Sequence, residues 1–347
     1  MSAPRIAISM GDPAGIGPEV TLRACAALDA AAGIPVVPTA SANVAAGDER
    51  GAGESASRAQ IVILGDPDHL ESLARDLGLD DSFNVRAAVH ACATVEPGLT
   101  PGKPRPADAR VALDCIVAAA DMAASGEAAA LVTAPVSKAG IAAIEPGFRG
   151  HTEFLAARAG VRDPLMVFAG IQPAVALLTT HLPLATALAM IRRPAIIAAL
   201  DRLHHGWQRW FGAPPRIGVA GLNPHAGERG LLGCEEETEI LPAIAAARDA
   251  GLQVTGPFPA DSIFRRTDID VILALYHDQG TIIAKRAPTP SVNLTLGLPY
   301  PRTSPDHGVA YDIAGHRVAD PAAMIAAIRL AAEMVAGGTA RFRAGDG

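Results

Sequence analysis

Three histidines that each follow an apolar run are the residues of this sequence best suited to chemistry. His181 ends VALLTTH, His225 ends RIGVAGLNPH and His277 ends VILALYH. Such runs predict buried strands, and the carboxyl ends of parallel strands meet at one edge of a sheet. Neutral imidazole nitrogens suit Zn²⁺ and similar divalent cations. The pattern therefore predicts a metal site, although each ring could instead cap a loop or bond a carbonyl.

Candidate proton acceptors accompany these histidines. Asp278 follows His277 in YHDQG and can either orient the imidazole or accept a proton. Asp261 and Lys138 are the other candidates for the proton acceptor. The residue types alone do not decide which of the three accepts the proton.

A second group of residues is suited to binding an anion. FRGHTEF places His151 and Thr152 at a predicted helix start, where free N–H groups and the helix dipole favour negative charge. Lys138 follows the strand in LVTAPVSK, and Lys285 and Arg302 add cations nearer the C-terminus. These groups would bind a carboxylate or phosphate. The alternatives are a capping box at Thr152 and solvated surface charge for the cations.

The glycine-rich stretch GDPAGIGPEV follows a predicted strand and precedes a predicted helix. Gly11, Gly15 and Gly17 do not complete a dinucleotide fingerprint, because Val20 occupies the third glycine position. No lysine completes a P-loop either. We interpret the stretch as a glycine-rich turn at an active site.

The elements that position these side chains are predicted from short apolar runs that alternate with helical patterns. This alternation predicts an α/β fold with a largely parallel sheet. The predicted strands are Arg5–Met10, Gln60–Leu64, Ala130–Thr133, Ala174–Thr179, Arg216–Ala220, Val271–Leu275 and Val292–Leu296. The predicted helices are Asp108–Ser125, Thr152–Ala159, Pro194–Phe211, Glu235–Ala250 and Pro321–Ala336. The small, polar stretch Thr39–Ala59 predicts a mobile surface insertion.

Length and composition limit the class of protein. The 347 residues suggest two domains or a single large α/β unit, and 50% apolar with 19% charged residues exclude global disorder. A net charge of −7 and 4% aromatic residues argue against a partner that is a nucleic acid or a membrane surface. The chain shows no signal segment, no apolar window of about 20 residues and no C-x-x-C pair. We therefore expect a cytoplasmic protein with reduced thiols.

An ordered set of motifs between Met10 and Asp320 carries a family resemblance. The motifs are GDPAGIGPE, TAPVSK, GHTEF, TTHLPL, GLNPHAGE, GPFPAD, YHDQG and NLTLGLPYPRTSPDHG. Together they resemble the 4-hydroxythreonine-4-phosphate dehydrogenase family of pyridoxal phosphate biosynthesis. In addition, DHGVAYDIAGHRVADP is similar to HGSAPDIAGKGIANP of the isopropylmalate dehydrogenases, whose NAD site is not a Rossmann loop.

The resemblance implies a two-lobed α/β/α fold with largely parallel sheets, like that of isocitrate and isopropylmalate dehydrogenases, with the active site in the interlobe cleft. It implies a cofactor-side lobe of residues 1–133 and 288–347. Residues 134–287 would form the lobe for metal, substrate and dimerisation. The protein would be a homodimer whose subunits share the active site.

The resemblance also assigns roles to individual residues. His181, His225 and His277 would bind the divalent metal (Zn, Mg or Co), with one of them supplied by the partner chain. The substrate residues would be His151, Thr152, Lys285, Asn293 and Arg302. NAD or NADP would lie along His307, Gly308 and Asp320. The sequence departs from the family at Val136 and Ser137, where relatives often carry Ile-Asn or Val-His, which bears on substrate detail.

The implied reaction is the NAD(P)- and metal-dependent oxidation of 4-phosphohydroxy-L-threonine to a 3-keto acid. Loss of CO₂ would then give 3-amino-2-oxopropyl phosphate, within pyridoxine 5'-phosphate biosynthesis. A divalent cation would act as a Lewis acid on the hydroxyl and on the enolate that follows decarboxylation. The alternatives are a paralogous dehydrogenase of phosphothreonate or phosphoerythronate, a metal-dependent hydrolase, and a non-catalytic metal- or phosphate-binding regulator.

Overall fold

The computed structural model describes residues 3–30, 59–79 and 84–337, and the chain divides into two compact units. The first unit comprises Met1–Gly160 and Leu298–Ala336, and the second is formed mainly by Val161–Gly297. All but the last residue of the predicted insertion Thr39–Ala59 lies outside the described residues.

Both divisions fall later in the chain than the lobe boundaries expected at 133/134 and 287/288. Helix α5 (Lys138–Ile144) packs against α4 (Pro106–Ser125), which keeps the chain after residue 133 in the first unit. Strand β10 (Val292–Leu296) pairs with β5 (Leu165–Ala169), which keeps it in the second unit. These contacts account for where the two compact units divide.

The first unit has five parallel strands in the order β3-β2-β1-β4-β11. They are β1 (Arg5–Ser9), β2 (Gln60–Gly65), β3 (Val89–Ala91), β4 (Ala130–Thr133) and β11 (Arg302–Pro305). The apolar side chains of β1, β2 and β4 are almost fully buried, because helices cover the strands. The parallel arrangement brings the carboxyl ends of the strands to one edge.

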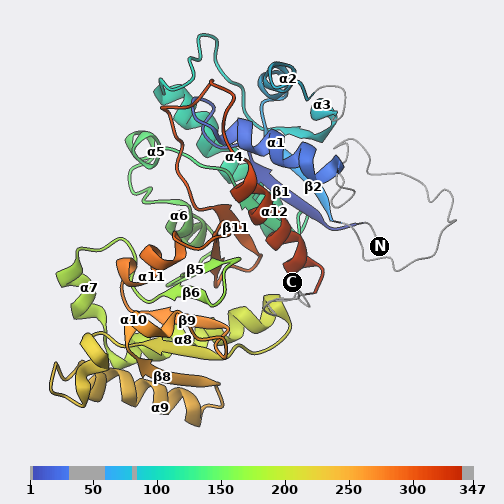
Figure 1. Ribbon diagram of the computed structural model, residues 1–347. Coiled ribbons are helices and arrows are strands. Elements are labelled where there is room, and N and C mark those ends of the chain that lie inside the picture. Colours follow the sequence, from blue (N-terminus) through green and yellow to red (C-terminus); the bar gives the residue numbers. More distant parts are fainter. Residues whose placement is uncertain (1–2, 31–58, 80–83, 338–347) are drawn as a thin grey trace, which may run out of the picture. The chain divides into compact units, whose positions relative to one another are not determined.

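Helix α4 packs against β1, β2 and β4, whereas α12 packs against β11, β4 and β1 and lies beside α1 (Figure 1). The helices of this unit are α1 (Gly17–Ala30), α2 (Pro67–Asp76), α3 (Val85–Ala88), α4, α5, α6 (His151–Arg158) and α12 (Ala322–Val335). Local sequence sets the ends of α4: Pro106 supplies the fixed φ of a first turn, and Gly126 ends the helix at φ 81°.

The second unit orders its strands β10-β5-β6-β9-β7-β8. The pairs β10–β5 and β5–β6 are antiparallel, and the pairs from β6 to β8 are parallel. The strands not yet given bounds are β6 (Ala174–Leu177), β7 (Ile217–Ala220), β8 (Val254–Phe258) and β9 (Val271–Ala274). The three adjacent parallel strands β6, β9 and β7 are the ones that precede the three histidines.

Helix α11 packs against β6 and β9, while α8 packs against β10, β5 and the neighbouring α9. The helices of this unit are α7 (Leu184–Met190), α8 (Arg193–Phe211), η1 (Pro224–Glu228), η2 (Glu236–Ile240), α9 (Leu241–Asp249), α10 (Ala260–Ile263) and α11 (His277–Ala284). Both units are therefore layered α/β structures, as the sequence predicts.

The seven predicted strands are present, with ends that differ by at most a few residues. Four strands were not predicted: β3, β5, β8 and β11. Strand β11 reads RTSP and has no apolar pattern, yet all four residues are buried, since it pairs with β4 and lies under α12. Tertiary pairing overrides the low strand propensity of such a segment.

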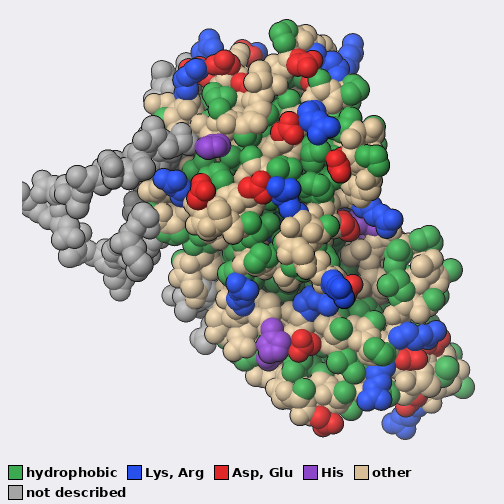
Figure 2. Space-filling view, turned by 180° about the vertical axis from the view of Figure 1, so that it is seen from behind, with side chains coloured by type: hydrophobic (Ala, Val, Ile, Leu, Met, Phe, Trp, Pro, Cys, Tyr) green, Lys and Arg blue, Asp and Glu red, His purple; other side chains and the backbone are tan. Residues whose placement is uncertain are grey.

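No helix in the described ranges is long and apolar enough to cross a membrane. On the face of the molecule shown in Figure 2, acidic and basic side chains are interspersed and form no single large basic patch.

Candidate functional site

The three candidate metal-ligating histidines follow adjacent parallel strands of the second unit. His181 comes after β6, His277 begins α11 directly after β9, and His225 lies in η1 after β7. Since β9 pairs with both β6 and β7 in parallel, all three strands end at the same edge of the sheet. The expected placement of the three residues at one sheet edge is therefore confirmed.

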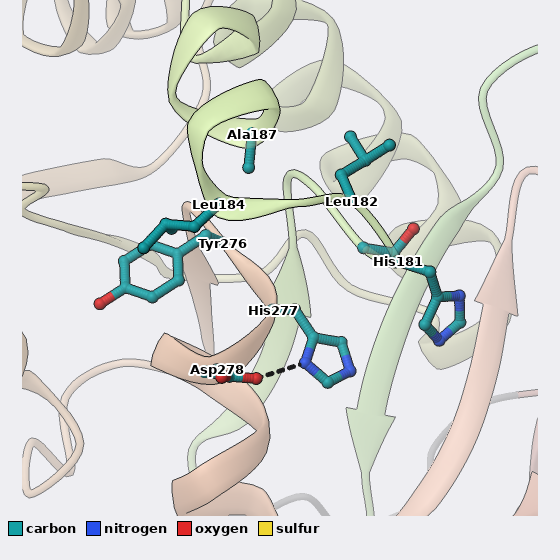
Figure 3. Close-up of a pocket in the computed structure, with 8 residues that line it drawn as sticks. His181, Leu182, Leu184, Ala187, Tyr276, His277 and Asp278 are labelled. Carbon is teal, nitrogen blue, oxygen red and sulfur yellow. Dashed lines mark hydrogen bonds and ion pairs between the residues drawn. The ribbon is translucent and has the colours of Figure 1, made fainter.

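Two of the three imidazole rings lie together. The ring centroids of His181 and His277 are 5.6 Å apart, with the planes inclined at 46°. They line a cavity of about 280 Å³, shown in Figure 3. The cavity is lined by Thr180, His181, Leu182, Leu184, Ala187, Tyr276, His277 and Asp278. Two imidazoles beside a mainly apolar wall are a suitable partial ligand set for a transition-metal ion.

Asp278 orients one of these rings. Its Oδ1 atom lies 2.7 Å from Nδ1 of His277 (Figure 3). The Thr281 hydroxyl lies 3.5 Å from the same nitrogen. With an ionised carboxylate as acceptor, Nδ1 carries the proton and Nε2 keeps its lone pair. A carboxylate–histidine pair of this kind prepares the imidazole to bind a metal ion.

Asp278→Asn is expected to weaken the binding of a divalent cation by about 10- to 100-fold, because the amide no longer selects the required tautomer. Isothermal titration of the metal-free protein with Zn²⁺ or Co²⁺ measures this loss. Asp201→Asn is the matched control, since Asp201 pairs with the exposed His205 at 3.3 Å on α8. Equal metal affinities of Asp278→Asn and the wild type would contradict the orienting role.

His225 lies in a loop of unusual backbone conformation. His225, Ala226, Glu228 and Arg229 have φ values of 54°, 53°, 43° and 56°, in the left-handed region that such residues rarely adopt. The buried Glu236 carboxylate holds the start of this loop, accepting hydrogen bonds at 2.8 and 2.7 Å from the backbone N–H groups of Leu222 and Asn223. Strained backbone held by surrounding structure is common at functional sites.

The exposed His225 does not complete a metal site by itself. Among the described residues of this single chain, no three His, Cys, Asp or Glu side chains form a group that could hold a metal ion. Within the described part of the single chain, the imidazoles of His181 and His277 are therefore paired, and His225 is not grouped with them.

Gln279 connects the His277 helix to the His225 loop. It is buried, its Oε1 accepts from the Leu275 N–H at 2.7 Å, and its Nε2 donates to the Gly221 carbonyl at 2.8 Å. The ends of β9 and β7 are thus held together by one side chain. The YHDQG motif contained this residue, but a lone amide gives no sequence signal for such a connection.

The candidate anion-binding residues His151, Thr152, Lys138 and Arg302 lie in the first unit. Helix α6 begins at His151, as predicted, and no side chain caps its start. A Cβ atom on Gly150 would lie 3.4 Å from Cε of Lys138, so this lysine lies beside the start of the helix. Free N–H groups and a lysine ammonium together favour an anion.

Arg302 is a buried cation in the same unit. The residue is 2% exposed, and its Nη2 donates to the Thr133 hydroxyl at 2.6 Å. Burial lowers the pKa of Arg302 to about 10, and the nearby Glu153 carboxylate opposes that change. The guanidinium remains charged at neutral pH, where it can bind a carboxylate or phosphate. Thr133 and Glu153 were not predicted, because single polar residues at such positions carry no pattern.

Burial lowers the pKa of His151 well below its ordinary value, and the positive charges of Arg302 and Lys138 lower it further. The folded protein therefore binds fewer protons at His151 than the unfolded chain does. By linkage, this group reduces the stability of the fold as the pH falls below about 6.5, the ordinary histidine pKa. At neutral pH the ring is uncharged.

When the pH is lowered from about 7 to about 5, the free energy of unfolding should consequently fall less for His151→Gln than for the wild type. Urea unfolding at the two pH values measures both changes. His205→Gln on the exposed surface of α8 is the control and should behave as the wild type. An equal loss of stability in wild type and His151→Gln would contradict the proposed neutral state of His151.

Three predicted site residues each hold a buried polar atom with no hydrogen-bond partner in the described part of the chain. These atoms are Nε2 of His151, Oδ1 of Asn293 and Nε2 of His307. A buried polar atom without a partner is destabilising, and such atoms are uncommon unless a ligand, ion or water satisfies them. Ser9, His69 and His204, which were not predicted as site residues, hold such atoms as well, so this feature fits a ligand at the site without identifying it.

The other predicted residues are more exposed. Asp261 lies in the first turn of α10, and Lys285 follows the last residue of α11. Gly308 is exposed, and its carbonyl lies 3.1 Å from Nδ1 of His307. Asp320 accepts a hydrogen bond from the Ala322 N–H at 2.9 Å, which supports the start of α12.

Comparisons with known proteins agree with the motifs. The family model described as pyridoxal phosphate biosynthetic protein PdxA matches residues 56–331. A 4-hydroxythreonine-4-phosphate dehydrogenase from Cupriavidus pinatubonensis is 41% identical over 95% of this chain and 94% of its own length. The crystal structure of an enzyme of that name from Klebsiella pneumoniae has a TM-score of 0.75 at 34% identity, covering 96% of this chain and 99% of that one.

A further solved structure has a different name. A terephthalate 1,2-cis-dihydrodiol dehydrogenase from Burkholderia xenovorans is 30% identical, with a TM-score of 0.64 and coverage of 96% of this chain and 98% of that chain. The same architecture therefore occurs in dehydrogenases whose names give different substrates.

Proposed function

Because the chain belongs to the pyridoxal phosphate biosynthetic protein PdxA family, we propose that it is an NAD(P)-dependent dehydrogenase that oxidises 4-phosphohydroxy-L-threonine. The product is the 3-keto acid, which loses CO₂ to give 3-amino-2-oxopropyl phosphate. The observation that carries this proposal is the 41% identity to an enzyme of that name along nearly the whole chain. The site geometry supports it.

The chain's own residues fit a divalent cation. His181 and His277 present two imidazoles 5.6 Å apart between ring centroids, and Asp278 holds His277 through Nδ1. Imidazole donors suit Zn²⁺ and Co²⁺ better than Mg²⁺, so we favour the first two ions. When bound, such an ion supplies Lewis-acid polarisation of the substrate hydroxyl.

Substrate orientation is assigned to the anion-binding residues. Arg302 provides a buried permanent charge for the phosphate or carboxylate, and His151 and Thr152 provide hydrogen-bonding groups at the start of α6. Asn293 and Lys285 are the substrate residues of the second unit. Asp278, Lys138 and Asp261 remain the candidates for the proton acceptor. Asp278 is the least available of the three, because its carboxylate is already bonded to His277.

NAD or NADP is assigned to the segment that carries His307 and Gly308. The unpartnered, buried Nε2 of His307 fits a ligand there. Gly308 leaves open space where a Cβ would stand, so a flat ring can approach its backbone. The nucleotide supplies the hydride acceptor of the reaction.

We also propose a homodimer with a shared metal site. Large apolar side chains are exposed on the elements that carry the three histidines. They are Leu182, Leu184, Leu188, Met190, Leu231, Leu232, Ile282 and Ile283. Several large apolar side chains exposed near one edge of the sheet favour a protein partner. A second copy would bury them and could bring its His225 to the His181–His277 pair, in line with the absence of a three-residue ligand group among the described residues of the single chain.

Mixing two inactive variants tests the shared site. His225→Ala and His277→Ala homodimers should each lack activity, whereas a mixed dimer keeps one site with both histidines if they come from different chains. Refolding equal amounts together should restore about a quarter of the wild-type activity, because half of the dimers are mixed and each has one intact site. Native mass spectrometry, with one variant labelled with ¹⁵N, confirms that mixed dimers formed. No recovery in confirmed mixed dimers would contradict the shared site.

The dehydrogenase itself is tested by incubating the protein with 4-phosphohydroxy-L-threonine and each nucleotide in turn, before and after chelation of metal ions. We expect absorbance of NADH or NADPH to appear, to vanish after chelation and to return with added Zn²⁺ or Co²⁺. Turnover without nucleotide reduction would instead indicate the hydrolase. Tight metal or phosphate binding without turnover would indicate the regulatory protein.

A dehydrogenase with another diol or hydroxy-acid substrate is the second candidate, favoured by the 30% identity to the terephthalate dihydrodiol dehydrogenase. Phosphothreonate and phosphoerythronate are the four-carbon alternatives. The buried Arg302 favours a substrate with a strongly anionic group. Relative kcat/KM values on these substrates and on 4-phosphohydroxy-L-threonine decide the assignment.

A further inference from the structure

Residues 306–320, here called the nucleotide segment, are tied to the glycine-rich turn and to α1 within the first unit. The Ile16 N–H donates to the Val309 carbonyl at 2.9 Å. The Ala319 N–H donates to the Glu19 carboxylate at 3.1 Å. Arg23 donates to the Arg317 carbonyl at 2.7 Å. These bonds join residues almost 300 positions apart in the sequence.

Asp12 connects the nucleotide segment to two other parts of the first unit. The residue is 1% exposed, and its carboxylate accepts from the Ala14 N–H at 2.9 Å and from the Tyr311 hydroxyl at 2.6 Å. It also accepts from the backbone N–H of Ser137, the residue before Lys138. One carboxylate therefore links the glycine-rich turn, the start of α5 and the nucleotide segment.

Two glycines of this region allow other segments of the chain to approach the nucleotide segment closely. A Cβ atom on Gly15 would lie 2.8 Å from the Val309 carbonyl oxygen, and one on Gly102 would lie 2.6 Å from the Tyr311 carbonyl oxygen. Neither position can hold a side chain without movement of the nucleotide segment. The glycines of GDPAGIGPE thus have a use other than direct approach to a pyrophosphate.

We infer that the Asp12–Tyr311 hydrogen bond positions the nucleotide segment for NAD(P) binding, with Glu19 as a second tether at the other end of the segment. This inference rests on the proposed nucleotide site. Asp12, Glu19 and Tyr311 are positioning residues, since they act on the nucleotide through the backbone that carries His307 and Gly308. Burial raises the pKa of Tyr311, and its hydrogen bond to Asp12 raises it further. The phenol stays protonated and continues to donate.

Tyr311→Phe removes the donor and keeps the ring. We expect the Kd of NADH or NADPH, whichever binds the wild type, to rise about tenfold in a fluorescence titration. The reason is that the variant loses one hydrogen bond to a charged group. The KM of the phosphorylated substrate at saturating nucleotide should change by less than about twofold. Glu19→Ala is the second variant, and it should weaken nucleotide binding in the same direction.

Hydrogen exchange gives a readout that does not depend on activity. The amides of residues 309–319 should exchange faster in Tyr311→Phe, while those of β7 and β9 should be unchanged. Asp76→Asn is the matched control, because it removes an exposed ion pair of 3.4 Å between Asp76 and Arg317 of the same segment. This control should change neither exchange nor nucleotide affinity.

Unchanged exchange, or an unchanged nucleotide Kd, in both Tyr311→Phe and Glu19→Ala would overturn this inference. Failure of the wild-type protein to bind either nucleotide would overturn the proposed function as well as this inference. Normal binding by the wild type together with unaltered variants would overturn the inference alone. Thermal melting of each variant identifies any that fails to fold, and the other variant then decides.

Discussion

His277→Ala is expected to lower kcat/KM by about a thousandfold or more and to abolish tight binding of Zn²⁺ or Co²⁺. The physical reason is that this ring is one of a pair 5.6 Å apart and is the one oriented by a carboxylate. Removal of one ligand from a small imidazole set loses several kcal/mol of Lewis-acid stabilisation. Steady-state kinetics and metal analysis of the purified variant measure both losses.

His205→Ala is the control for this experiment, because it removes an imidazole from the exposed surface of α8 in the same unit. It should retain wild-type turnover and metal content. The fold of His277→Ala should also survive, since the ring is partly exposed and lies outside the core. Full turnover of a metal-free His277→Ala enzyme would refute the proposal that the reaction depends on a metal ion bound by His277.

Arg302→Ala is expected to raise the KM of the phosphorylated substrate by about a hundredfold, with a smaller effect on kcat. A buried guanidinium interacts with an anion in a weakly screened environment, and its truncation costs about 2–5 kcal/mol of binding. Arg302→Lys should recover only part of the loss, because an ammonium cannot bond Thr133 and a carboxylate or phosphate in the same fork geometry. Substrate saturation curves at fixed nucleotide concentration measure these changes.

The matched control is Arg158→Ala, which removes an exposed arginine that pairs with Asp121 at 2.6 Å. This variant lies on α6, the helix that begins at His151, and it should leave the KM within about twofold. An unchanged KM in folded Arg302→Ala would remove this residue from the anion site. A raised KM for the nucleotide alone would reassign Arg302 to cofactor binding.

The local elements that carry the site were largely predictable. Apolar runs identified β6, β7 and β9, and the GHTEF motif located the start of α6 at His151. These signals are local, since periodicity, capping and strand propensity depend on neighbouring residues. The order of motifs also identified the family before any geometry was considered.

Other features depend on contacts between distant residues. Strand β11 is polar in sequence and is a strand only because β4 and α12 surround it. The boundaries between the two compact units depend on such contacts too, since α5 packs against α4 and β10 pairs with β5. No local sequence pattern predicts which distant elements pair.

The site shows the same distinction. The amino-acid sequence alone determined which side chains are candidates for the chemistry, among them His181, His277, His151 and Arg302, because residue type and position after a strand are local properties. Only the tertiary structure decided that two imidazoles lie together, that Asp278 holds one of them and that Arg302 is buried. It also decided that Asp12 meets Tyr311. Distances, burial and the resulting pKa changes arise from packing of segments far apart in the chain, which residue order does not encode locally.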